Sequence, residues 1–355
     1  MQKSGTSTAR VVVGGTLIGL VALVVAGRLL SSGLQPPAAR PTPATTVPAA
    51  IAPSTTAPVV PVVATVQVGA EPTQVAVGAG GVWVGVWATG KLVRIDPASN
   101  RVVARIPVGR PQESPIAIAV ADRAVWVVDF GDARVLRIDP VTNRVVARIP
   151  VRGGAGGIGV GAGAVWVTSG EGGDRRHGWV QRLDPARNRV EATIGVPGGL
   201  QLWGVAVSGQ SVWAGNALGR LWRLDPRRNQ VTATVRAAQT GGASPPGIGH
   251  LAAGADAIWT GADGQLLRLD PRSGHLVATI PWVAGSHDAY SGVGAGSVWF
   301  ASGDRLVRVD PATNRLVAIA TIPGLDSAGI AASADAVWVL SGDLLVRIDP
   351  ARIPS

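Results

Sequence analysis

Residues 124–151 read AVWVVDFGDARVLRIDPVTNRVVARIPV, and seven versions of this stretch follow one another along the chain. Each version opens with a tryptophan, at Trp83, Trp126, Trp166, Trp213, Trp259, Trp299 and Trp338. Each also contains x-Asp-Pro, with its aspartate at Asp96, Asp139, Asp184, Asp225, Asp270, Asp310 and Asp349. Consecutive aspartates lie 43, 45, 41, 45, 40 and 39 residues apart. The chain is therefore a tandem repeat with a period in the low forties.

One period contains four short β-type runs. In the first copy these are residues 74–77, 82–86, 92–95 and 102–107, separated by turn residues. One sheet of four such strands has two apolar faces, so it needs a neighbour on each side. Repeats of this length and strand content are typical of β-propellers. We therefore predict an all-β fold, a seven-bladed β-propeller with four antiparallel strands per blade, and place the repeated tryptophans in the core between blades.

The Asp-Pro pair of each copy is predicted to form the turn between the third and fourth strands. Aspartate can accept hydrogen bonds from the N–H groups that follow it, and proline sets the first turn angle. The residue four after the aspartate is asparagine in five copies and Gly274 in another, which indicates a position with positive φ. We therefore assign these aspartates to turn structure rather than catalysis. The arginine two residues before each aspartate is expected to be solvated or paired with aspartate.

The seventh copy lacks a fourth strand, because the chain ends shortly after Asp349. A counterpart lies at the other end of the repeats, where residues 62–68 (VVATVQV) match residues 102–108 (VVARIPV). We therefore expect residues 62–68 to form the outermost strand of the seventh blade. This N-terminal strand would close the last blade and remove two open sheet edges.

The composition limits the available chemistry. The chain has no cysteine, which excludes a disulfide framework, a thiolate metal site and a lipid-modified cysteine. Its 355 residues with 46% hydrophobic content are enough to bury a large core. The formal net charge of +10 points to an anionic partner, although most of the arginines belong to the repeat.

Residues 1–30 and 31–61 differ from the repeats in composition. Residues 11–27 are uncharged and mostly apolar, and as a helix they would span about 25 Å, near the lower limit for a bilayer. Basic residues before them favour a cytoplasmic N-terminus. We predict that residues 1–30 are an uncleaved signal anchor and transmembrane helix, with a cleaved secretory signal as the alternative. Residues 31–61 are proline-rich and are expected to be a disordered linker that carries the propeller, residues 62–355.

The repeat has a known counterpart. Residues 138–151 (IDPVTNRVVARIPV) resemble the YVTN-type, YncE-like seven-bladed propeller repeat. The resemblance covers residues 62–353 and implies an exported bacterial protein with a binding function. Asn216 matches the asparagine that this family has after its second strand. A related group, the streptogramin B (virginiamycin B) lyases, opens a cyclic ester with a histidine base and Mg²⁺, and the resemblance implies this activity as the enzymatic alternative.

Two connections are longer than their counterparts, and both are expected at the same rim of the propeller. They are residues 169–178 in the third copy and residues 237–250 before the fifth. The residues that precede each first strand should surround the channel mouth at this rim, where Ser114 also departs from the repeat. The candidate ligand-binding residues there are Glu71, Gln74, Gln201, Trp203, His250, His287, Asp288, Tyr290 and Asp326. A polar, hydrated channel mouth without a ligand is the alternative.

The lyase alternative needs a histidine base and carboxylates that hold Mg²⁺. The candidate catalytic histidines are His250 and His287, and the candidate carboxylates are Asp263, Asp288 and Asp326. The glutamate that the lyase pattern asks for after the fifth repeated tryptophan is missing. The sequence also lacks a nucleophile elbow, a phosphate-binding loop and an H-E-x-x-H motif. We therefore expect a non-catalytic binding or scaffold module with no cofactor, and Mg²⁺ only if the lyase alternative holds.

Arginines surround the opposite rim, in the turns between third and fourth strands. They are Arg101, Arg144, Arg187, Arg189, Arg227, Arg228, Arg272 and Arg315. These side chains could meet anionic wall polymers or lipid headgroups, or could simply be solvated. Nucleic acid is disfavoured, because export is predicted and no aromatic residues alternate with the arginines. We expect a monomeric head on the extracytoplasmic side of the membrane that binds a protein, a peptide or a cell-envelope component.

Overall fold

The structure is a computed structural model. It describes residues 62–121, 123–169, 177–199, 202–216, 219–236, 250–254, 256–262, 265–282, 290–322 and 327–353. The predicted signal anchor (1–30) and linker (31–61) lie outside the described residues. The candidate site residues that also lie outside them are Gln201, Asp263, His287, Asp288 and Asp326. Within the described residues, no helix combines the length and the apolar composition needed to cross a membrane.

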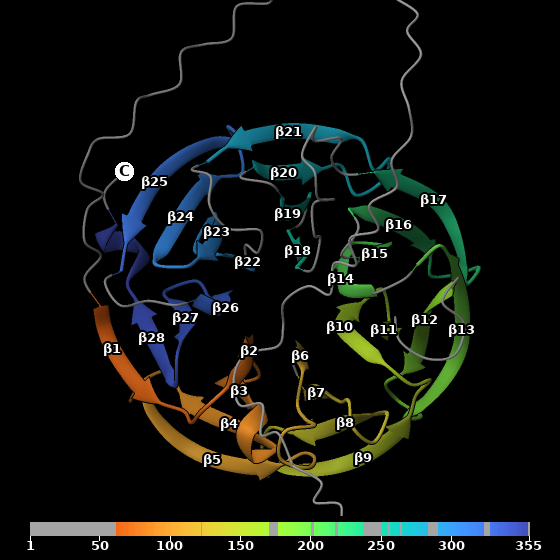
Figure 1. The fold of residues 1–355 in the computed structure, drawn as a ribbon, viewed down its shortest axis with the longest axis horizontal. Helices are drawn as coiled ribbons and strands as arrows, with labels where there is room; N and C mark the ends of the chain where they lie inside the picture. Colours follow the sequence, from red (N-terminus) through yellow and green to blue (C-terminus); the bar gives the residue numbers. More distant parts are fainter. Residues whose placement is uncertain are drawn as a thin grey trace, which may run out of the picture. The chain divides into compact units, whose positions relative to one another are not determined.

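The described chain forms seven four-stranded sheets in a ring (Figure 1). We call the four strands of each sheet a, b, c and d, in their order from the centre of the ring to its outside. The a strands are β2 (Pro72–Gly78), β6 (Ala117–Ala121), β10 (Ala155–Gly161), β14 (Leu202–Ser208), β18 (Ala252–Ala253), β22 (Tyr290–Gly294) and β26 (Ser327–Ala332). The b strands are β3 (Gly81–Val86), β7 (Ala124–Asp129), β11 (Ala164–Ser169), β15 (Ser211–Asn216), β19 (Ile258–Ala262), β23 (Ser297–Ser302) and β27 (Val337–Ser341).

The outer two strands of each blade follow the same order. The c strands are β4 (Lys91–Asp96), β8 (Arg134–Asp139), β12 (His177–Asp184), β16 (Arg220–Asp225), β20 (Gln265–Leu269), β24 (Arg305–Asp310) and β28 (Leu344–Ile348). The d strands are β5 (Arg101–Pro107), β9 (Arg144–Pro150), β13 (Arg189–Pro197), β17 (Gln230–Arg236), β21 (Leu276–Pro281), β25 (Arg315–Thr321) and β1 (Val62–Gln67). Among the described residues, the 3-10 helix η1 (Trp87–Thr89) lies between β3 and β4, and the 3-10 helix η2 (Pro350–Arg352) follows β28. The seven-bladed, antiparallel, all-β propeller is confirmed.

The repeated tryptophans lie in the core between blades. Each of the seven is at most 1% exposed. Trp83 of blade one, for example, packs with Val125, Val127 and Leu136 of blade two. A tryptophan that buries 150–250 Å² contributes about 4–6 kcal/mol before the entropy of ordering is subtracted. The predicted core position of these residues is therefore confirmed.

The ring is closed by β1, which pairs antiparallel with β28 as the outermost strand of blade seven. Val66 lies opposite Leu345, and the Val68 N–H donates to the Asp343 carbonyl at 3.0 Å. Val66 and Val68 are both buried. The first strand of the propeller and the last three therefore form one sheet, as the match of residues 62–68 to the repeat predicts.

The Asp-Pro turns have the predicted geometry. Asp96 Oδ1 accepts a hydrogen bond from the N–H two residues later at 3.0 Å, and the equivalent aspartates do the same. Asn100, four residues after the aspartate, has a φ of 55°, and Gly274 has a φ of 75°. A hydrogen bond from the Arg187 side chain is the main reason why the pKa of Asp184 is lowered to about 2. These carboxylates are therefore part of the turns.

The repeated arginine of strand c connects its blade to the next one. The Arg94 guanidinium lies over the Trp83 ring, 5.0 Å from the ring centroid. Its Nη1 donates to the Pro140 carbonyl and, at 2.9 Å, to Asn143 Oδ1, both in the c–d turn of blade two. An arginine in this position thus covers one face of the tryptophan and bonds across the blade boundary.

The same contact recurs around the ring, from the arginine to the asparagine of the following turn. The pairs are Arg137 with Asn188, Arg182 with Asn229, Arg268 with Asn314, and Arg347 with Asn100. The last pair joins blade seven to blade one and supports the closure by β1. Of the expectation that these arginines are solvated or paired with aspartate, the aspartate pair is found for Arg347, which contacts Asp335 at 3.5 Å. The recurring acceptors are instead asparagine side chains and proline carbonyls of the next blade.

The contact from blade four to blade five departs from this pattern, because one residue of the turn is replaced. Gly274 replaces asparagine in the turn of blade five, and the Arg223 side chain donates to Ser211 Oγ of its own blade at 3.4 Å instead of to the next turn. The indole N–H of Trp213 donates instead to the Pro271 carbonyl at 3.0 Å. A Cβ on Gly274 would lie 2.5 Å from the Trp213 ring. In this blade the Trp213 indole bonds to the proline carbonyl that accepts from the arginine in other blades, and its ring lies where the asparagine side chain would be.

Deletion of residues 62–68 should lower the melting temperature by more than about 5 °C, because loss of a few kcal/mol shifts the melting of a domain of this size by several degrees. Thermal unfolding followed by circular dichroism measures the effect. A deletion of equal length at residues 44–50, upstream of the propeller, is the control and should leave the transition in place. Identical melting curves for the two deletions would show that β1 does not close the ring.

The contact between Arg94 and Asn143 should be measurable in a double-mutant cycle. Arg94→Ala and Asn143→Ala should each lower the free energy of unfolding by about 1.5–3 kcal/mol, the range for a hydrogen bond to a charged group. Their coupling should be about 1 kcal/mol or more, as measured by denaturant unfolding. Arg223→Ala is the matched control and should cost less, because Arg223 does not bond to the next turn. Additive effects at positions 94 and 143 would refute the contact.

Candidate functional site

The two rims of the propeller are formed by different connections between strands. Because the strands of each blade are antiparallel, the d–a connections and the b–c turns meet at one rim, which we call the d–a rim. The a–b and c–d turns form the opposite rim, the c–d rim. The a strands surround the centre of the ring (Figure 1). The start of each a strand therefore lies at the central mouth of the d–a rim.

Aromatic and polar side chains concentrate at one position of the a strands. This position lies two residues before the one that pairs with the repeated tryptophan. From blade one to blade seven its residues are Gln74, Ala117, Gly157, Gly204, His250, Tyr290 and Gly329. Four blades thus have alanine or glycine where blades five and six have rings. The mouth is therefore asymmetric.

The structure brings two of the candidate residues together. The rings of His250 and Tyr290 are stacked across the boundary between blades five and six, with centroids 4.2 Å apart and planes tilted by 41°. The Thr260 hydroxyl donates to the His250 carbonyl at 3.0 Å, which fixes the backbone of His250 at the start of its blade. Both rings are partly buried. The pair is therefore held in place and still reaches the surface.

Trp203 is the third aromatic candidate at the mouth. It is the second residue of β14, and its side chain remains 37% exposed. A Cβ on Gly156 would lie 3.0 Å from the Trp203 ring, and one on Gly157 would lie 2.2 Å from the Trp203 carbonyl oxygen. The glycines of β10 thus allow the tryptophan to lie close against blade three. An indole supported on one side and open on the other is suited to contact a partner.

Two further candidates have structural contacts. The Gln74 side-chain oxygen accepts a hydrogen bond from the Ile118 N–H and so links blades one and two. Glu71 is exposed and has a positive φ of 55°, and its carbonyl accepts the Trp87 N–H at 3.0 Å. Ser114, which also departs from the repeat, is fully buried. The side-chain oxygen of Gln74 is therefore occupied by its neighbour, whereas the Glu71 carboxylate faces solvent.

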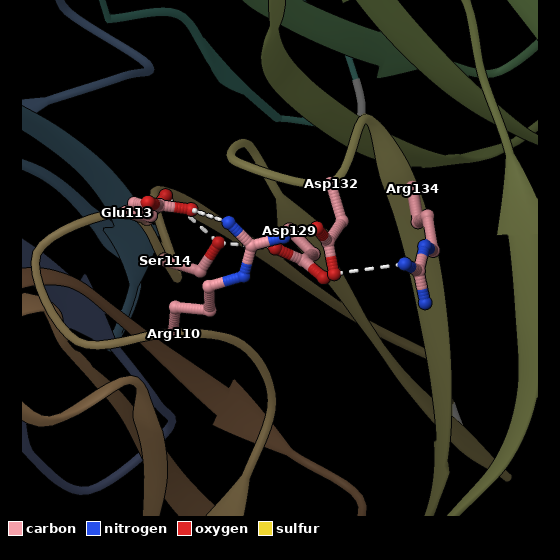
Figure 2. A network of polar contacts seen from close by, with 6 residues as sticks. All are labelled: Arg110, Glu113, Ser114, Asp129, Asp132 and Arg134. Carbon is pink, nitrogen blue, oxygen red and sulfur yellow. Dashed lines mark hydrogen bonds and ion pairs between the residues drawn. The ribbon is translucent and has the colours of Figure 1, made fainter.

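A polar network, of which the sequence pointed only to Ser114, lies on the d–a rim of blade two (Figure 2). Arg110 contacts Glu113 at 3.2 Å and Asp132 at 2.7 Å. Asp132 also pairs with Arg134 at 2.8 Å. These contacts connect the segment between β5 and β6 to the turn between β7 and β8. The network thus holds one d–a connection against the neighbouring b–c turn.

The buried part of this network is Ser114 with Asp129. The Ser114 hydroxyl donates to Asp129 Oδ1, and Asp129 is 3% exposed at the end of β7. The equivalent residues, three after each repeated tryptophan, are Val86, Asp129, Ser169, Asn216, Ala262, Ser302 and Ser341. A charge at this position occurs in blade two and in no other copy. Alignment of the seven copies at this position is the sequence signal that could have found the site.

The c–d rim carries the exposed arginines that the sequence predicts. Arg187 pairs with Asp184 at 2.7 Å, and Arg228 pairs with Asp225 at 3.4 Å. Arg101, Arg144, Arg189, Arg227, Arg272 and Arg315 are also exposed. The structure shows the rim open to solvent, and binding of an anionic polymer there stays a prediction.

The residues of the lyase alternative are described in part. His250 stacks on Tyr290, whereas His287, Asp263, Asp288 and Asp326 lie outside the described residues. Among the residues that are described, no group of three or more His, Cys, Asp or Glu side chains could hold a metal ion. The Mg²⁺ site and the lyase activity therefore stay predictions.

Comparisons with known proteins identify the fold. No protein-family model matches the chain, and no curated protein matches it. The chain is similar to hydrazine synthase from Kuenenia stuttgartiensis, with a TM-score of 0.66 and 12% identity over 80% of this chain and 97% of that one. It is also similar to the β-propeller domain of Cps50 (Swd1) from Myceliophteria thermophila, with a TM-score of 0.64 and 12% identity over 82% and 99% of the two chains. At this identity the likeness shows the propeller fold alone.

Proposed function

We propose that this protein is a non-catalytic binding or scaffold module, tethered to a membrane, whose extracytoplasmic propeller binds a protein or peptide at the mouth of the d–a rim. The propeller fold is compatible with such a module. The single observation that supports the proposal is the asymmetry of the mouth, where Trp203, His250 and Tyr290 lie on blades four to six. The corresponding positions of the other blades carry smaller side chains.

These aromatic residues have the properties of binding hot spots. Tryptophan and tyrosine supply large contact areas with few rotatable bonds, and they are enriched among the residues that dominate binding energy. Trp203 and Tyr290 lie in strands and His250 lies just before one, so the rigid sheets hold these side chains in place. Trp203 is 37% exposed although it packs on blade three. A peptide that covers this ring would bury apolar surface that is now in contact with water.

The N-terminal segments support the tether. Residues 11–27 are long enough to approach the thickness of the hydrocarbon core, at about 1.5 Å per residue. The proline-rich residues 31–61 would hold the propeller away from the bilayer. The resemblance of the repeat to exported YVTN-type propellers is consistent with this placement. A cell-envelope ligand is an alternative partner for the same mouth.

Peptide binding at the mouth should depend on the aromatic residues. Peptides selected from a random display library against the detergent-solubilised full chain should bind Trp203→Thr and Tyr290→Ala at least about tenfold more weakly, since removal of a hot-spot residue costs 2 kcal/mol or more. Fluorescence anisotropy of the labelled peptides measures the affinity. Threonine and alanine occupy the equivalent positions of blades one and two, at Thr73 and Ala117, so the variants are expected to fold.

Val141→Ala is the matched control for this measurement. Val141 is 85% exposed and lies in the c–d turn of blade two, on the opposite rim. Its truncation should leave peptide affinity unchanged. The proposal fails if selection yields no peptides with a common motif, or if the common peptides bind the Trp203 and Tyr290 variants as tightly as they bind the natural chain.

The orientation in the membrane can be tested because the chain has no cysteine. Val141→Cys should react with a membrane-impermeant maleimide on intact cells, whereas Ser4→Cys should react only after lysis. Both variants should sediment with membranes after an alkaline carbonate wash. Labelling of Ser4→Cys on intact cells would contradict the cytoplasmic N-terminus. Recovery of the chain without its N-terminal cysteine would favour the cleaved signal.

A further inference from the structure

A cavity of about 190 Å³ lies at the boundary between blades one and two, away from the central mouth. One wall is the end of the outer strand of blade one, at Pro107, Val108 and Gly109. The other wall belongs to blade two and consists of Asp129, Asp132, Arg134, Leu136 and Arg148. A water molecule takes about 30 Å³ in the liquid, so the cavity has room for several waters or for one small molecule.

The preceding blade boundary shows how this space is filled elsewhere. Arg105 of blade one and Arg148 of blade two occupy equivalent positions, opposite Val93 and Leu136 in their sheets. Arg105 Nη1 donates to the Val68 carbonyl at 2.8 Å and so bonds across the boundary between blades seven and one. Arg148 makes no such bond to a described residue and lines the cavity. Its guanidinium is therefore available to an acceptor from outside the chain.

Asp129 is the buried charge of the cavity wall. It is 3% exposed, and its partner among the described residues is the Ser114 hydroxyl, which is neutral. Arg134 lies opposite Asp129 in the β7–β8 pair but forms its ion pair with Asp132, and burying a carboxylate without an ion pair is costly. Blades three and four have Ser169 and Asn216 at the same position, both buried, so the fold does not require a charge there. A neutral residue would serve the structure, and the carboxylate therefore indicates a role in binding.

The charges of the cavity define the ligand. Asp132 pairs with both Arg134 at 2.8 Å and Arg110 at 2.7 Å, which leaves the Asp129 carboxylate without an ion pair and the exposed Arg148 guanidinium without an acceptor among the described residues. The four charged side chains in the wall sum to zero, so an ion of one sign would bring an uncompensated charge into a partly buried site. A molecule with an ammonium group and a carboxylate satisfies both residues at once.

We infer that the cavity between blades one and two binds a small zwitterion, a free α-amino acid. Its ammonium group would donate to Asp129, and its carboxylate would accept from the fork of Arg148. Gly109 is part of the site because a Cβ there would lie 2.9 Å from Asp129 Oδ1 and 2.4 Å from the Ser114 Cβ. This site is separate from the aromatic mouth and does not depend on the proposed peptide binding.

The test is isothermal titration of the detergent-solubilised full chain with glycine, alanine and serine. Saturable binding is expected for at least one of them. N,N,N-trimethylglycine keeps both charges but has no N–H donor, and it should bind at least about tenfold more weakly because it cannot hydrogen bond to the carboxylate. Erythritol tests a polyol of similar size and should not bind.

Two variants test whether the amino acid binds in this cavity, and a third serves as the control. Asp129→Asn and Arg148→Thr should each weaken amino-acid binding at least about tenfold. Both replacements occur at the equivalent positions of other blades, as Asn216 and Thr193, so the propeller should keep its fold, which circular dichroism verifies. Arg105→Thr makes the same change at the neighbouring boundary and should leave the affinity unchanged, although it removes the bond to Val68.

Each outcome decides the inference independently of the peptide experiment. Saturable amino-acid binding that is lost in Asp129→Asn and Arg148→Thr but kept in Trp203→Thr supports it. The inference is overturned if no amino acid binds at tens of millimolar, or if the two cavity variants bind as the natural chain does. Equal binding of N,N,N-trimethylglycine, or binding of erythritol alone, would overturn it as well.

Discussion

Seven tryptophan side chains, each at most 1% exposed, fill the spaces between neighbouring blades. Each blade depends on this contact, because a four-stranded sheet with two apolar faces cannot bury them alone. In most blades a strand-c arginine lies over the indole, and in five blades it also bonds to the next c–d turn. One residue pair thus combines apolar burial, a cation–π contact and a directional bond. The circular arrangement allows all seven tryptophans to be buried against a neighbouring blade.

Because these contacts do not involve the d–a rim, the side chains on that rim can differ between copies. The repeated tryptophans, arginines and asparagines lie in the b and c strands and in the c–d turns, whereas the starts of the a strands contribute little to the contact between tryptophan and arginine. His250, Tyr290 and Trp203 depart from the small residues of other copies without disturbing it. The proposed peptide site and the proposed amino-acid site both use this freedom, one at the central mouth and one at a blade boundary.

The loss of a repeated contact residue is tolerated where another side chain of the repeat makes a hydrogen bond in its place. Gly274 removes the asparagine that accepts from arginine elsewhere, and Trp213 then donates to the Pro271 carbonyl in its place. In the cavity between blades one and two, no described residue takes over the bond that Arg105 makes one blade earlier. Comparison of equivalent positions therefore separates an exchange of structural partners from a site that remains open to a ligand.

The period, the position of the tryptophans, the Asp-Pro turns and the closure by residues 62–68 could all be predicted from the sequence, because each is a local pattern repeated seven times. His250 and Tyr290 could be named as candidates, but their stacking is known only from the structure, since it depends on how neighbouring blades pack. Asp129 and Arg148 were not found at all. They lie 19 residues apart on strands b and d of one blade, and the tertiary structure alone brings both to a cavity that Val108 of the preceding blade also lines.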